Sequence, residues 1–531
     1  MGQILQLIEM ESCRLSDSAI RILRFANVGY SPATGTAHII YGDPVDQLYE
    51  PRLIQPAHMR RDAFSQGRTG GAVQTNYGEM ILANADGGLD YLQGYAFDGR
   101  RFRYLVGEEG TAYDDLIVAL NGVMELALFD LEKITFRIRD RAWEFFQKPV
   151  QPNLYLGNNS GGNGIEGTSE LQGVQKPLLM GELIFWQPVL VNASKLIYQF
   201  QDETIMHWLK PSITPHSTYD GAAVLAAGLP YSSQADMETN APPAGTFRAW
   251  IEGGCFRLGS APALALTYIY YENFTHSDWV AAGLDNRTVG AWIYFVLRDR
   301  AALSDSEIEV ADLANLIGTT PSIAVGEGWT IGETLNQLCQ ADLAWWGFDR
   351  AGKFRCRTLE VPFIANSIAT FTDIDILEIE TAPTNDENRG VPAYQVKAGA
   401  MQSHYVNSDN QIAGSASTEN KAIAKQRYYY YTTPENSAVK TKHPGSQVLN
   451  IMSTAHASGA AYIAPLAANL FGTERRIYNV KVFASLDTIA IIDIGATVTI
   501  DHSRFYPPKH LLVLGIAENH SERTLDMTLW G

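Results

Sequence analysis

The chain has 531 residues, of which 46% are hydrophobic and 18% are charged, and its formal net charge is −18 at pH 7. This length exceeds what one hydrophobic core organises, so three or four domains are expected. The acidic balance argues against a protein that grips nucleic acid by its phosphates, because such binding needs clustered lysine and arginine. No stretch approaches the ~20 apolar residues of a membrane span, so none is predicted.

The first part of the chain favours β-structure, in keeping with 45 glycines and 25 tyrosines overall. Ile20–Phe25 alternates well enough to form a strand, and His38–Pro44 indicates a second strand that Gly-Asp-Pro ends. A glycine-rich loop at Gly67–Gly71 leads into Tyr77–Ile138, the stretch with the clearest β-pattern. Within it, Arg101–Gly107 alternates basic and apolar residues, which is typical of a strand with one buried and one wet face.

This stretch resembles the first β-barrel domain of phage tail-tip (baseplate) hub proteins. The shared pattern is an Asn-x-Asp-Gly-x-Leu-Asp run, an Asp-Gly-Arg turn before an alternating strand, and a later Ile-x-Phe-x-Ile-Arg-Asp strand. The residues that carry the pattern are Asn84, Asp86, Gly87, Leu89, Asp90, Asp98, Gly99, Arg100, Ile134, Phe136, Ile138 and Asp140. The motif is structural, and further matches in the same order along the chain strengthen it.

A polar loop at Gly157–Gly167 formally contains a dinucleotide-binding fingerprint, Gly162-x-Gly164-x-x-Gly167. That fingerprint binds a cofactor only between a strand and a helix, with an acidic residue ~20 positions later. Here the glycines lie among asparagines and serines, and Leu171–Pro177 does not open a helix. We therefore predict a loop and no cofactor, and the segment that follows, Lys176–Glu182, resembles the start of the second hub domain.

The region from Leu196 to Tyr270 is expected to be β-like. Strands are predicted at Leu196–Phe200, Ile205–Leu209, Thr246–Ile251 and Cys255–Gly259. The last of these resembles the Phe-Arg-Leu-Gly strand of hub proteins.

Residues 301–362 change to a helical period. Ser304 and Thr330 each begin a capping-box sequence, and an amphipathic helix is predicted through Leu335–Leu343. A hairpin turned at Arg-Ala-Gly then follows at Trp345–Arg355. A helix before "Trp-Gly-Phe-Asp-x-x-Gly-Lys-Phe" and "Leu-Glu-x-Pro" resembles a small α/β domain of phage hubs, and this is the most specific match in the chain.

The last 150 residues return to β-structure. The four tyrosines at Tyr428–Tyr431 could stack sugars or bases, although buried packing at an interface is the favoured interpretation. Ala455–Phe471 is helix-capable, and the final strands resemble the closing barrel of the hub family. The predicted strands are Val391–Ala398, Gln426–Tyr431, Ile494–Ile500, Leu511–Ile516 and Thr524–Gly531.

The four cysteines, Cys13, Cys255, Cys339 and Cys356, are scattered without a Cys-x-x-Cys pair. This spacing is typical of reduced, buried thiols in a protein made in the cytosol. A metal or iron–sulfur cluster would need the fold to gather all four, and the spacing gives no support for one. No metal site is predicted.

The sequence offers no catalytic constellation. It contains no Gly-x-Ser-x-Gly elbow, His-Glu-x-x-His motif, kinase signature or P-loop, and its 11 histidines are spread singly. The acid pairs Glu108-Glu109 and Asp114-Asp115 are adjacent, so their side chains point apart in an extended segment. We therefore expect no enzymatic activity and assign no catalytic, cofactor-binding or metal-binding residue.

The predicted fold is a β-rich multidomain (α+β) protein with two hub-type β-barrels. The expected domains are a first barrel at residues 1–150, a second β-rich domain at 151–300, a small α/β domain at 301–375 and a closing barrel at 376–531. The two barrels are expected to share a topology and to pack side by side, so that three copies form a six-fold-like ring.

The resemblance implies a structural protein, the hub at the distal tip of a phage tail, assembled in the host cytoplasm and retained in the virion. It implies a homotrimer that joins the tail tube or a distal tail protein, and the tape-measure protein, to fibre or receptor-binding proteins. DNA would pass through without specific binding, along a neutral to acidic wall. The alternative is a carbohydrate-binding or depolymerising tail protein. The sequence leaves open which tail protein binds which face, the host receptor and whether the resting channel is plugged.

Overall fold

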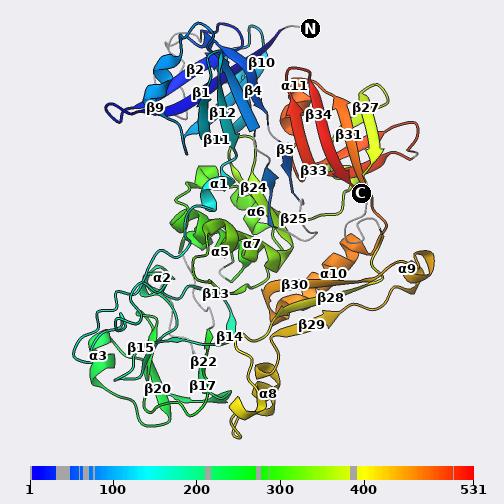
Figure 1. Ribbon diagram of the computed structural model, residues 1–531. Helices are drawn as coiled ribbons and strands as arrows, with labels where there is room; N and C mark the ends of the chain where they lie inside the picture. Colours follow the sequence, from blue (N-terminus) through cyan, green and yellow to red (C-terminus); the bar gives the residue numbers. More distant parts are fainter. Residues whose placement is uncertain are drawn as a thin grey trace.

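The computed structural model shows a β-rich chain arranged as several sheet units around a central helical unit (Figure 1). The residues that it describes are 3–31, 48–58, 60–63, 71–75, 78–209, 217–270, 277–285, 287–382, 391–505 and 507–531. The predicted strand at His38–Pro44 lies outside them, as does most of the predicted loop at Gly67–Gly71. Within the described ranges, no helix is long and apolar enough to cross a membrane.

The N-terminal unit is a nine-stranded sheet, drawn from blue to cyan at the top left of Figure 1. Its strands follow the spatial order β3-β2-β1-β10-β11-β12-β8-β4, and β9 pairs with β1. Alternate residues along β12 are buried, as the period-two pattern predicts. The bounds are β1 Ile4–Arg14, β2 Ile20–Ala26, β3 Glu50–Pro51, β4 Leu53–His58, β8 Gly78–Ala83, β9 Tyr95–Ala96, β10 Arg101–Glu108, β11 Ile117–Phe129 and β12 Lys133–Arg139.

The C-terminal unit is built on the spatial order β26-β32-β33-β34-β31-β27 (Figure 1, right). Its inner face holds a separate hydrophobic core that includes Val480, Val498 and Leu529. The bounds are β26 Ser367–Thr372, β27 Ile376–Thr381, β31 Ile477–Phe483, β32 Thr497–Asp501, β33 Lys509–Asn519 and β34 Thr524–Trp530.

Both sheets curl on themselves without closing. In the first, the end strands β3 and β4 are separated in the chain by Arg52 alone. In the second, the end strands β26 and β27 are separated by residues 373–375. The two ends of each path must therefore lie close together, yet no ladder between the described strands joins them. The prediction of two hub-type β-barrels is not confirmed, because the described residues form two curved open sheets and no closed barrel.

The two sheets repeat one topology. β4, β8, β10, β11 and β12 correspond in chain order and in spatial order to β27, β31, β32, β33 and β34, and every pairing among them is antiparallel in both. A short helix precedes β10 and β32 alike: the 3₁₀ helix η1, Asp90–Gly94, and α11, Leu486–Ile491. Bulges also recur at matching places, between Met124 and Leu126 in the β11–β12 ladder and between Val513 and Gly515 in the β33–β34 ladder.

The connection between β27 and β31 holds a further sheet of three strands, β29-β28-β30, backed by a helix, α10 (Figure 1). The strands are β28 Gln395–Met401, β29 Tyr428–Thr432 and β30 Val448–His456, and α10 is Ala460–Phe471. The helix predicted through Ala455–Phe471 is present but begins five residues later. Tyr429 and Tyr430 are 45% and 47% exposed, so these two tyrosines are not buried within the single chain.

The region 151–300 contains two small sheets, ordered β14-β22-β17-β18 and β15-β16-β21-β20-β19. The strands are β14 Leu183–Trp186, β15 Val189–Asn192, β16 Ile197–Gln199, β17 Ser217–Asp220, β18 Ala223–Val224, β19 Ala226–Ala227, β20 Thr246–Trp250, β21 Cys255–Leu258 and β22 Leu266–Tyr270. The strand predicted at Ile205–Leu209 is wrong, because these residues belong to a helix, α2 (Glu203–Leu209). Asp202 Oδ1 accepts a hydrogen bond from Thr204 N at 3.0 Å at the start of α2, which favours the helical turn.

The central unit agrees closely with its sequence pattern. Thr330 and Glu333 form the predicted capping box at the start of α7 (Ile331–Asp342). The hairpin of β24 (Ala344–Phe348) and β25 (Phe354–Thr358) follows, and turns at residues 349–353. Its core is continuous with that of α5 (Val289–Phe295) and with the sheet backed by α10, so this unit connects the upper and lower halves of the chain in Figure 1.

Candidate functional site: the junction between the repeated sheets

A short strand from the N-terminal unit completes the C-terminal sheet. β5 (Arg60–Asp62) is the next strand along the chain after β4, but it pairs antiparallel with Gly515–Ala517 of β33 in the C-terminal sheet. The backbone N–H of Ala63 extends the contact by donating to the carbonyl of Leu514 at 2.7 Å. β6 (Gly71–Ala72) pairs in turn with β24, so the β4–β8 connection joins three units.

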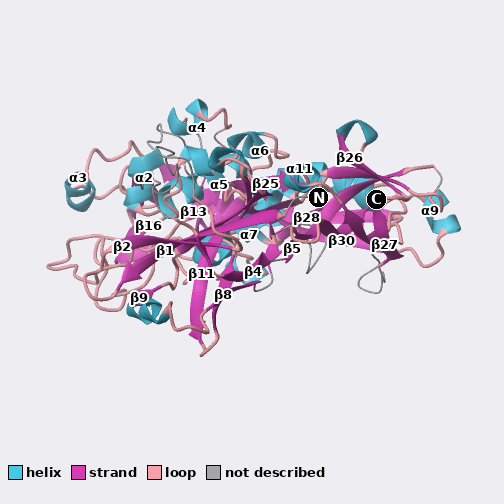
Figure 2. Cartoon of the chain, turned by 90° about the horizontal axis from the view of Figure 1, so that it is seen from above, coloured by secondary structure: helices cyan, strands magenta, loops and turns pink. Residues whose placement is uncertain are grey.

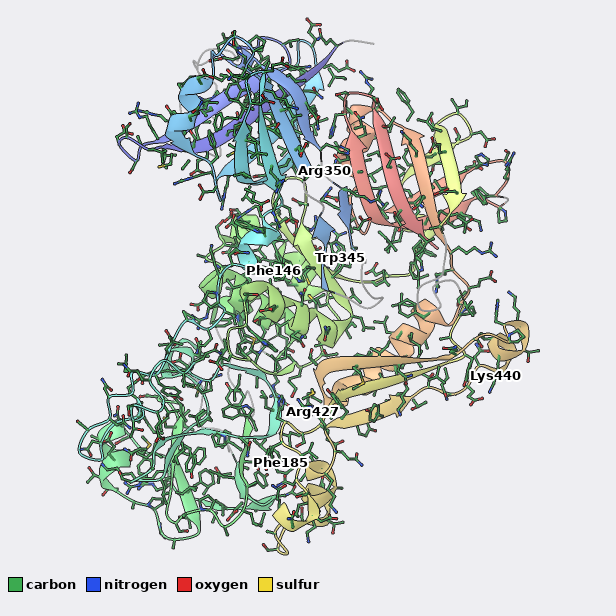
Figure 3. The ribbon with its side chains drawn as sticks, in the orientation of Figure 1. Phe146, Phe185, Trp345, Arg350, Arg427 and Lys440 are labelled. Atoms are coloured by element: carbon green, nitrogen blue, oxygen red, sulfur yellow. The ribbon has the colours of Figure 1, made fainter. Side chains whose placement is uncertain are left out.

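A buried charge cluster lies at this junction. Arg61 Nη2 is 2.9 Å from a carboxylate oxygen of Asp493 and 3.3 Å from Glu518 Oε1. Arg350, in the turn of the β24–β25 hairpin, places its Nη2 2.9 Å from the same Glu518 oxygen. Arg350 also donates to the backbone carbonyls of Ile489 and Ile492. Figure 3 labels Arg350 where the three units meet. The Glu518 carboxylate of β33 thus binds one side chain from β5 and one from the hairpin.

The electrostatics of the cluster favour ionised Glu518. Burial alone would raise its pKa, but the charges of Arg350, His520 and Arg61 outweigh burial and lower the pKa to about 2. His520 Nε2 lies 3.2 Å from the second oxygen of Glu518. Burial alone would lower the pKa of Arg61, but Asp493 and Glu518 outweigh it and raise that pKa. Glu518 therefore offsets the buried guanidinium of Arg350 and, together with Asp493, that of Arg61.

Polar and aromatic contacts join the two sheets beside this cluster. Gln6 Nε2 donates to Tyr104 Oη at 3.0 Å within the first sheet and to Ser521 Oγ at 2.8 Å across the junction. The Tyr104 ring meets the His520 ring edge-on, with centroids 5.6 Å apart. The two sheet units therefore pack side by side, as Figure 1 shows.

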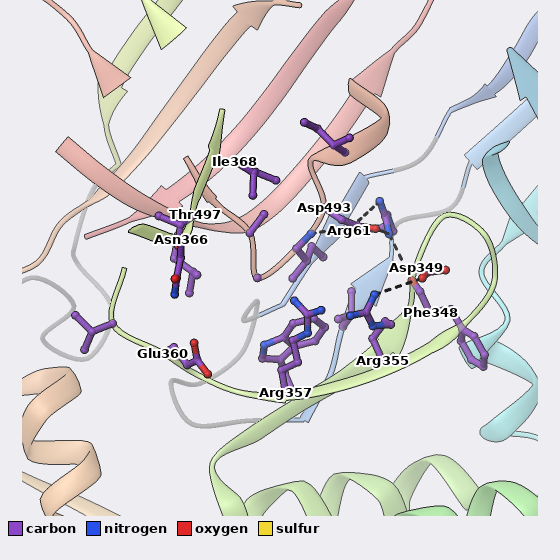
Figure 4. A pocket seen from close by; sticks show the side chains of 18 residues that line it. Arg61, Phe348, Asp349, Arg355, Arg357, Glu360, Asn366, Ile368, Asp493 and Thr497 are labelled. Carbon is purple, nitrogen blue, oxygen red and sulfur yellow. Dashed lines mark hydrogen bonds and ion pairs between the residues drawn. The ribbon is translucent and has the colours of Figure 1, made fainter. Parts of the chain in front are cut away.

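A cavity of ≈ 360 Å³ opens next to the cluster, between the β24–β25 hairpin and the C-terminal sheet (Figure 4). Its charged wall is formed by Arg355 and Arg357 on the hairpin, both of which bind Asp312 through Nε, at 2.7 and 3.1 Å. Arg355 also lies 3.7 Å from Asp349. The other lining residues are Arg61, Val73, Trp345, Phe348, Glu360, Val361, Asn366, Ile368, Ile491, Asp493, Ile494, Gly495, Ala496, Thr497 and Leu512.

The arginine side chains at this cavity are paired with carboxylates. Burial raises the pKa values of Asp312 and Asp349, and arginines lie beside both. Among the described residues that line the cavity, none is a histidine, cysteine or serine that a carboxylate could activate. The ion pairs of Asp312 lie within the central unit, where they join the helix that carries Asp312 to the β24–β25 hairpin.

The glycine-rich segment, Gly157–Gly167, forms a loop that side-chain hydrogen bonds hold in place. Asn159 Nδ2 donates to the carbonyls of Gly164 and Val191, at 3.1 and 2.7 Å, and Glu238 accepts from the N–H of Gly164 at 3.0 Å. The residues after it form turns rather than a long helix. These bonds tie the loop to its neighbours, in agreement with the interpretation as a loop.

The four cysteines are free. The thiols of Cys339 and Cys356 lie 3.7 Å apart in the central core, whereas Cys13 and Cys255 belong to other units. Cys13 is partly exposed, contrary to the expectation that all four are buried. Across the ranges that the structure describes, no three histidine, cysteine or acidic side chains are grouped to hold a metal ion.

Sequence reasoning did not find Arg61, Arg350 or Glu518. Arg61 follows an irregular polar stretch, Arg350 lies in a predicted turn, and Glu518 ends an apolar strand. Each is an ordinary polar residue in its own segment, and 168 residues separate Arg350 from Glu518. The only available signal was the resemblance of the hairpin to a hub domain, which marked the segment but not its contacts.

Comparison with known proteins gives similarities at the level of structure only. No protein-family model matches the chain, and no curated protein matches its sequence. A tail protein from Neisseria meningitidis aligns with 8% identity over 90% of this chain and 91% of its own, with a TM-score of 0.38. A 43 kDa tail protein of prophage MuSo2 from Shewanella oneidensis aligns with 9% identity over 91% and 95%, with a TM-score of 0.39.

A prophage tail protein from Listeria monocytogenes aligns with 7% identity over 100% of this chain and 94% of its own, with a TM-score of 0.37. TM-scores of this size do not by themselves establish a shared fold.

Proposed function

We propose that this chain is a structural protein of a phage tail, the baseplate hub that forms a trimeric ring at the distal end of the tail tube. The proposal joins the residue motifs of the hub family to the topology of the chain. It assigns no catalytic step, and it gives the charge cluster of Arg61, Arg350 and Glu518 the role of holding the sheet units together.

The observation that carries the proposal is the repeated sheet. One chain presents two curved sheets of equivalent topology, side by side and joined by β5 and the Arg61–Glu518–Arg350 cluster. Three such chains would present six equivalent sheets in one ring. A ring of six matches a tube with six-fold symmetry, and a closed ring satisfies both junction surfaces of every subunit.

The channel wall is proposed to be neutral to acidic. The outer face of the C-terminal sheet has an open hollow of ≈ 720 Å³ lined by Glu378, Glu380 and Asp526, with Lys481 and Arg60 as its cations. Carboxylates repel a passing phosphate backbone, whereas a wall rich in lysine and arginine would hold it. Such a face suits DNA that passes without specific binding.

The remaining partners follow from the same place in the particle. A hub at the distal tip would bind the tail tube or a distal tail protein on one side, the tape-measure protein in the channel, and fibre or receptor-binding proteins below. Its location would be the virion, after assembly in the host cytoplasm.

The test is native mass spectrometry of the purified chain and of assembled tails, with cryo-electron microscopy of the tails. A homotrimer at the end of the tube, with the two sheets of each subunit alternating around the ring, is expected. A monomer or dimer in assembled tails would contradict the hub proposal. A ring of arginines as the dominant lumen charge would contradict the wall proposal alone.

One observation favours the second candidate, a carbohydrate-binding tail protein. On the outer face of the sheet that contains β29, the Tyr428 and Tyr430 rings lie 6.4 Å apart, and Lys397 Nζ is 4.3 Å from the Tyr430 ring centroid. Exposed aromatic rings can stack on sugars. Binding of host polysaccharide that is lost in Tyr430→Ala and retained in the control Tyr462→Ala would favour this candidate. Tyr462 is exposed on α10.

A further inference from the structure

The strand β33 shows how a free edge is filled in this fold. β32 pairs with the first part of β33, Lys509–Leu512, and leaves the part beyond the bulge without that neighbour. β5 takes this place by pairing with Gly515–Ala517. At this paired edge the segment that follows β4 binds the C-terminal sheet.

The equivalent strand of the first sheet has the same edge without such a neighbour. β10 pairs with Ile117–Val123 of β11, and a bulge follows between Met124 and Leu126. Beyond the bulge, Leu126–Phe129 pairs with β12 on one side. On the other side, where β5 lies in the C-terminal sheet, none of the described strands pairs with it. An unpaired edge of this kind is a template for another strand.

The side chains at this edge are apolar and exposed. Leu126 and Leu128 are 43% and 47% exposed, and Leu131 at the hairpin tip is 89% exposed. The positions in β33 that correspond to Leu126 and Leu128 by their distance from the bulge are Gly515 and Ala517, which β5 covers. Figure 2 shows β11 extending beyond the body of the chain. An exposed apolar strand with an unpaired edge indicates a site of contact with another protein chain.

We propose that the edge Leu126–Phe129 of β11 pairs with a strand from the C-terminal sheet unit of a neighbouring copy of this chain. The inference rests on the proposed function, because it supplies the contact that closes the ring. Within one chain the first sheet sends a strand to the edge of the second sheet. A ring that alternates the two equivalent sheets needs the converse contact between chains, and the free edge lies at the equivalent place.

The repeat also explains why the occupant is a second copy. The β27–β31 ladder corresponds to the β4–β8 ladder whose continuation carries β5. It too continues beyond its strands, because the N–H of Ala382 donates to the carbonyl of Ile477 at 2.9 Å. Because the two sheets repeat one topology, the contact that β5 makes with β33 inside one chain has its counterpart between the C-terminal sheet of one copy and β11 of the next.

The test compares a double variant with a matched control. Leu126→Lys with Leu128→Lys places lysines on the free edge, which oppose strand addition in natural sheets. Leu156→Lys with Leu229→Lys makes the same change at two other exposed leucines. Analytical ultracentrifugation should show the wild type and the control as trimers. The edge variant should trimerise at least ~10-fold more weakly, as expected for lost anchors of an interface.

Hydrogen exchange supplies the second readout. The amides of residues 126–129 should be slow to exchange in the trimer and fast in the monomeric edge variant, whereas the buried strand β12 should exchange equally slowly in both. Slow exchange in β12 shows that the variant is folded. An edge variant that trimerises normally, with residues 126–129 unprotected in the wild-type trimer, would overturn this inference and leave the hub proposal standing.

Two other results separate the proposals. A wild-type chain that is monomeric in assembled tails would overturn the hub proposal and this inference together. Cross-links from position 128, introduced as Leu128→Cys, that reach only a different tail protein would overturn the second copy as the occupant while the ring remains.

Discussion

Replacing Glu518 with glutamine should open the junction between the two sheets. The variant keeps the shape of the side chain and removes the charge that Arg61 and Arg350 share at 3.3 and 2.9 Å. The pKa of Glu518 is lowered to about 2 from an ordinary value of 4.5. Lowering the pKa from 4.5 to about 2 corresponds to about 3 kcal/mol at neutral pH. That agrees with the ~3–5 kcal/mol lost when one partner of a buried ion pair is removed.

The assay is hydrogen exchange at pH 7 across Gly515–Ala517, where β5 pairs with β33. Exchange through local opening of this contact should be faster by roughly two orders of magnitude in Glu518→Gln, because about 1.4 kcal/mol is a factor of ten. Glu522→Gln, at an exposed glutamate in the turn that follows β33, is the control and should change the free energy of opening by less than ~0.5 kcal/mol. A loss below about 1 kcal/mol in Glu518→Gln would refute the shared-anion explanation.

The difference between wild type and Glu518→Gln should depend on pH in a defined direction. Because the pKa of Glu518 is lower in the folded chain than in the unfolded chain, its stabilisation is complete above about pH 4.5. It should then decrease as the pH falls towards about 2, where the folded carboxylate takes up its proton. A difference that grows on acidification would contradict the assignment.

Two further predictions concern glycines in close contacts, and a third concerns a buried histidine. Gly515→Ala should weaken the β5 contact and speed exchange of the paired amides, since an added Cβ would lie 2.0 Å from Asp62 Oδ1. Gly181→Ala should lower the free energy of unfolding by at least ~1 kcal/mol, because φ there is +82° and the added Cβ would lie 1.8 Å from the Pro321 carbonyl oxygen. Urea unfolding measures this change, and an unchanged midpoint would contradict it. Burial lowers the pKa of His404 to about 4, so thermal stability should fall as the pH drops from about 6.5 towards 4, and less so in His404→Gln.

The sequence determined the elements whose signals are local. The capping box at Thr330 and Glu333, the hairpin of β24 and β25, and the alternating strand β12 all appear where their patterns predict them. Each depends on bonds between residues close in the chain, so a short window contains the information. The same windows misread α2 as a strand, because a short apolar run does not distinguish the two structures.

Only the tertiary structure decided which strands meet. Period two shows that β5 and β33 can be strands, but it does not show that Arg60–Asp62 leaves its own sheet to pair with Gly515–Ala517. The junction cluster follows from that pairing, because Arg61 reaches Glu518 only across 457 residues of chain. The open form of both sheets was undetermined for the same reason. Closure depends on whether edge strands come within hydrogen-bonding distance, and that distance is set by the curvature of the whole sheet rather than by any one strand.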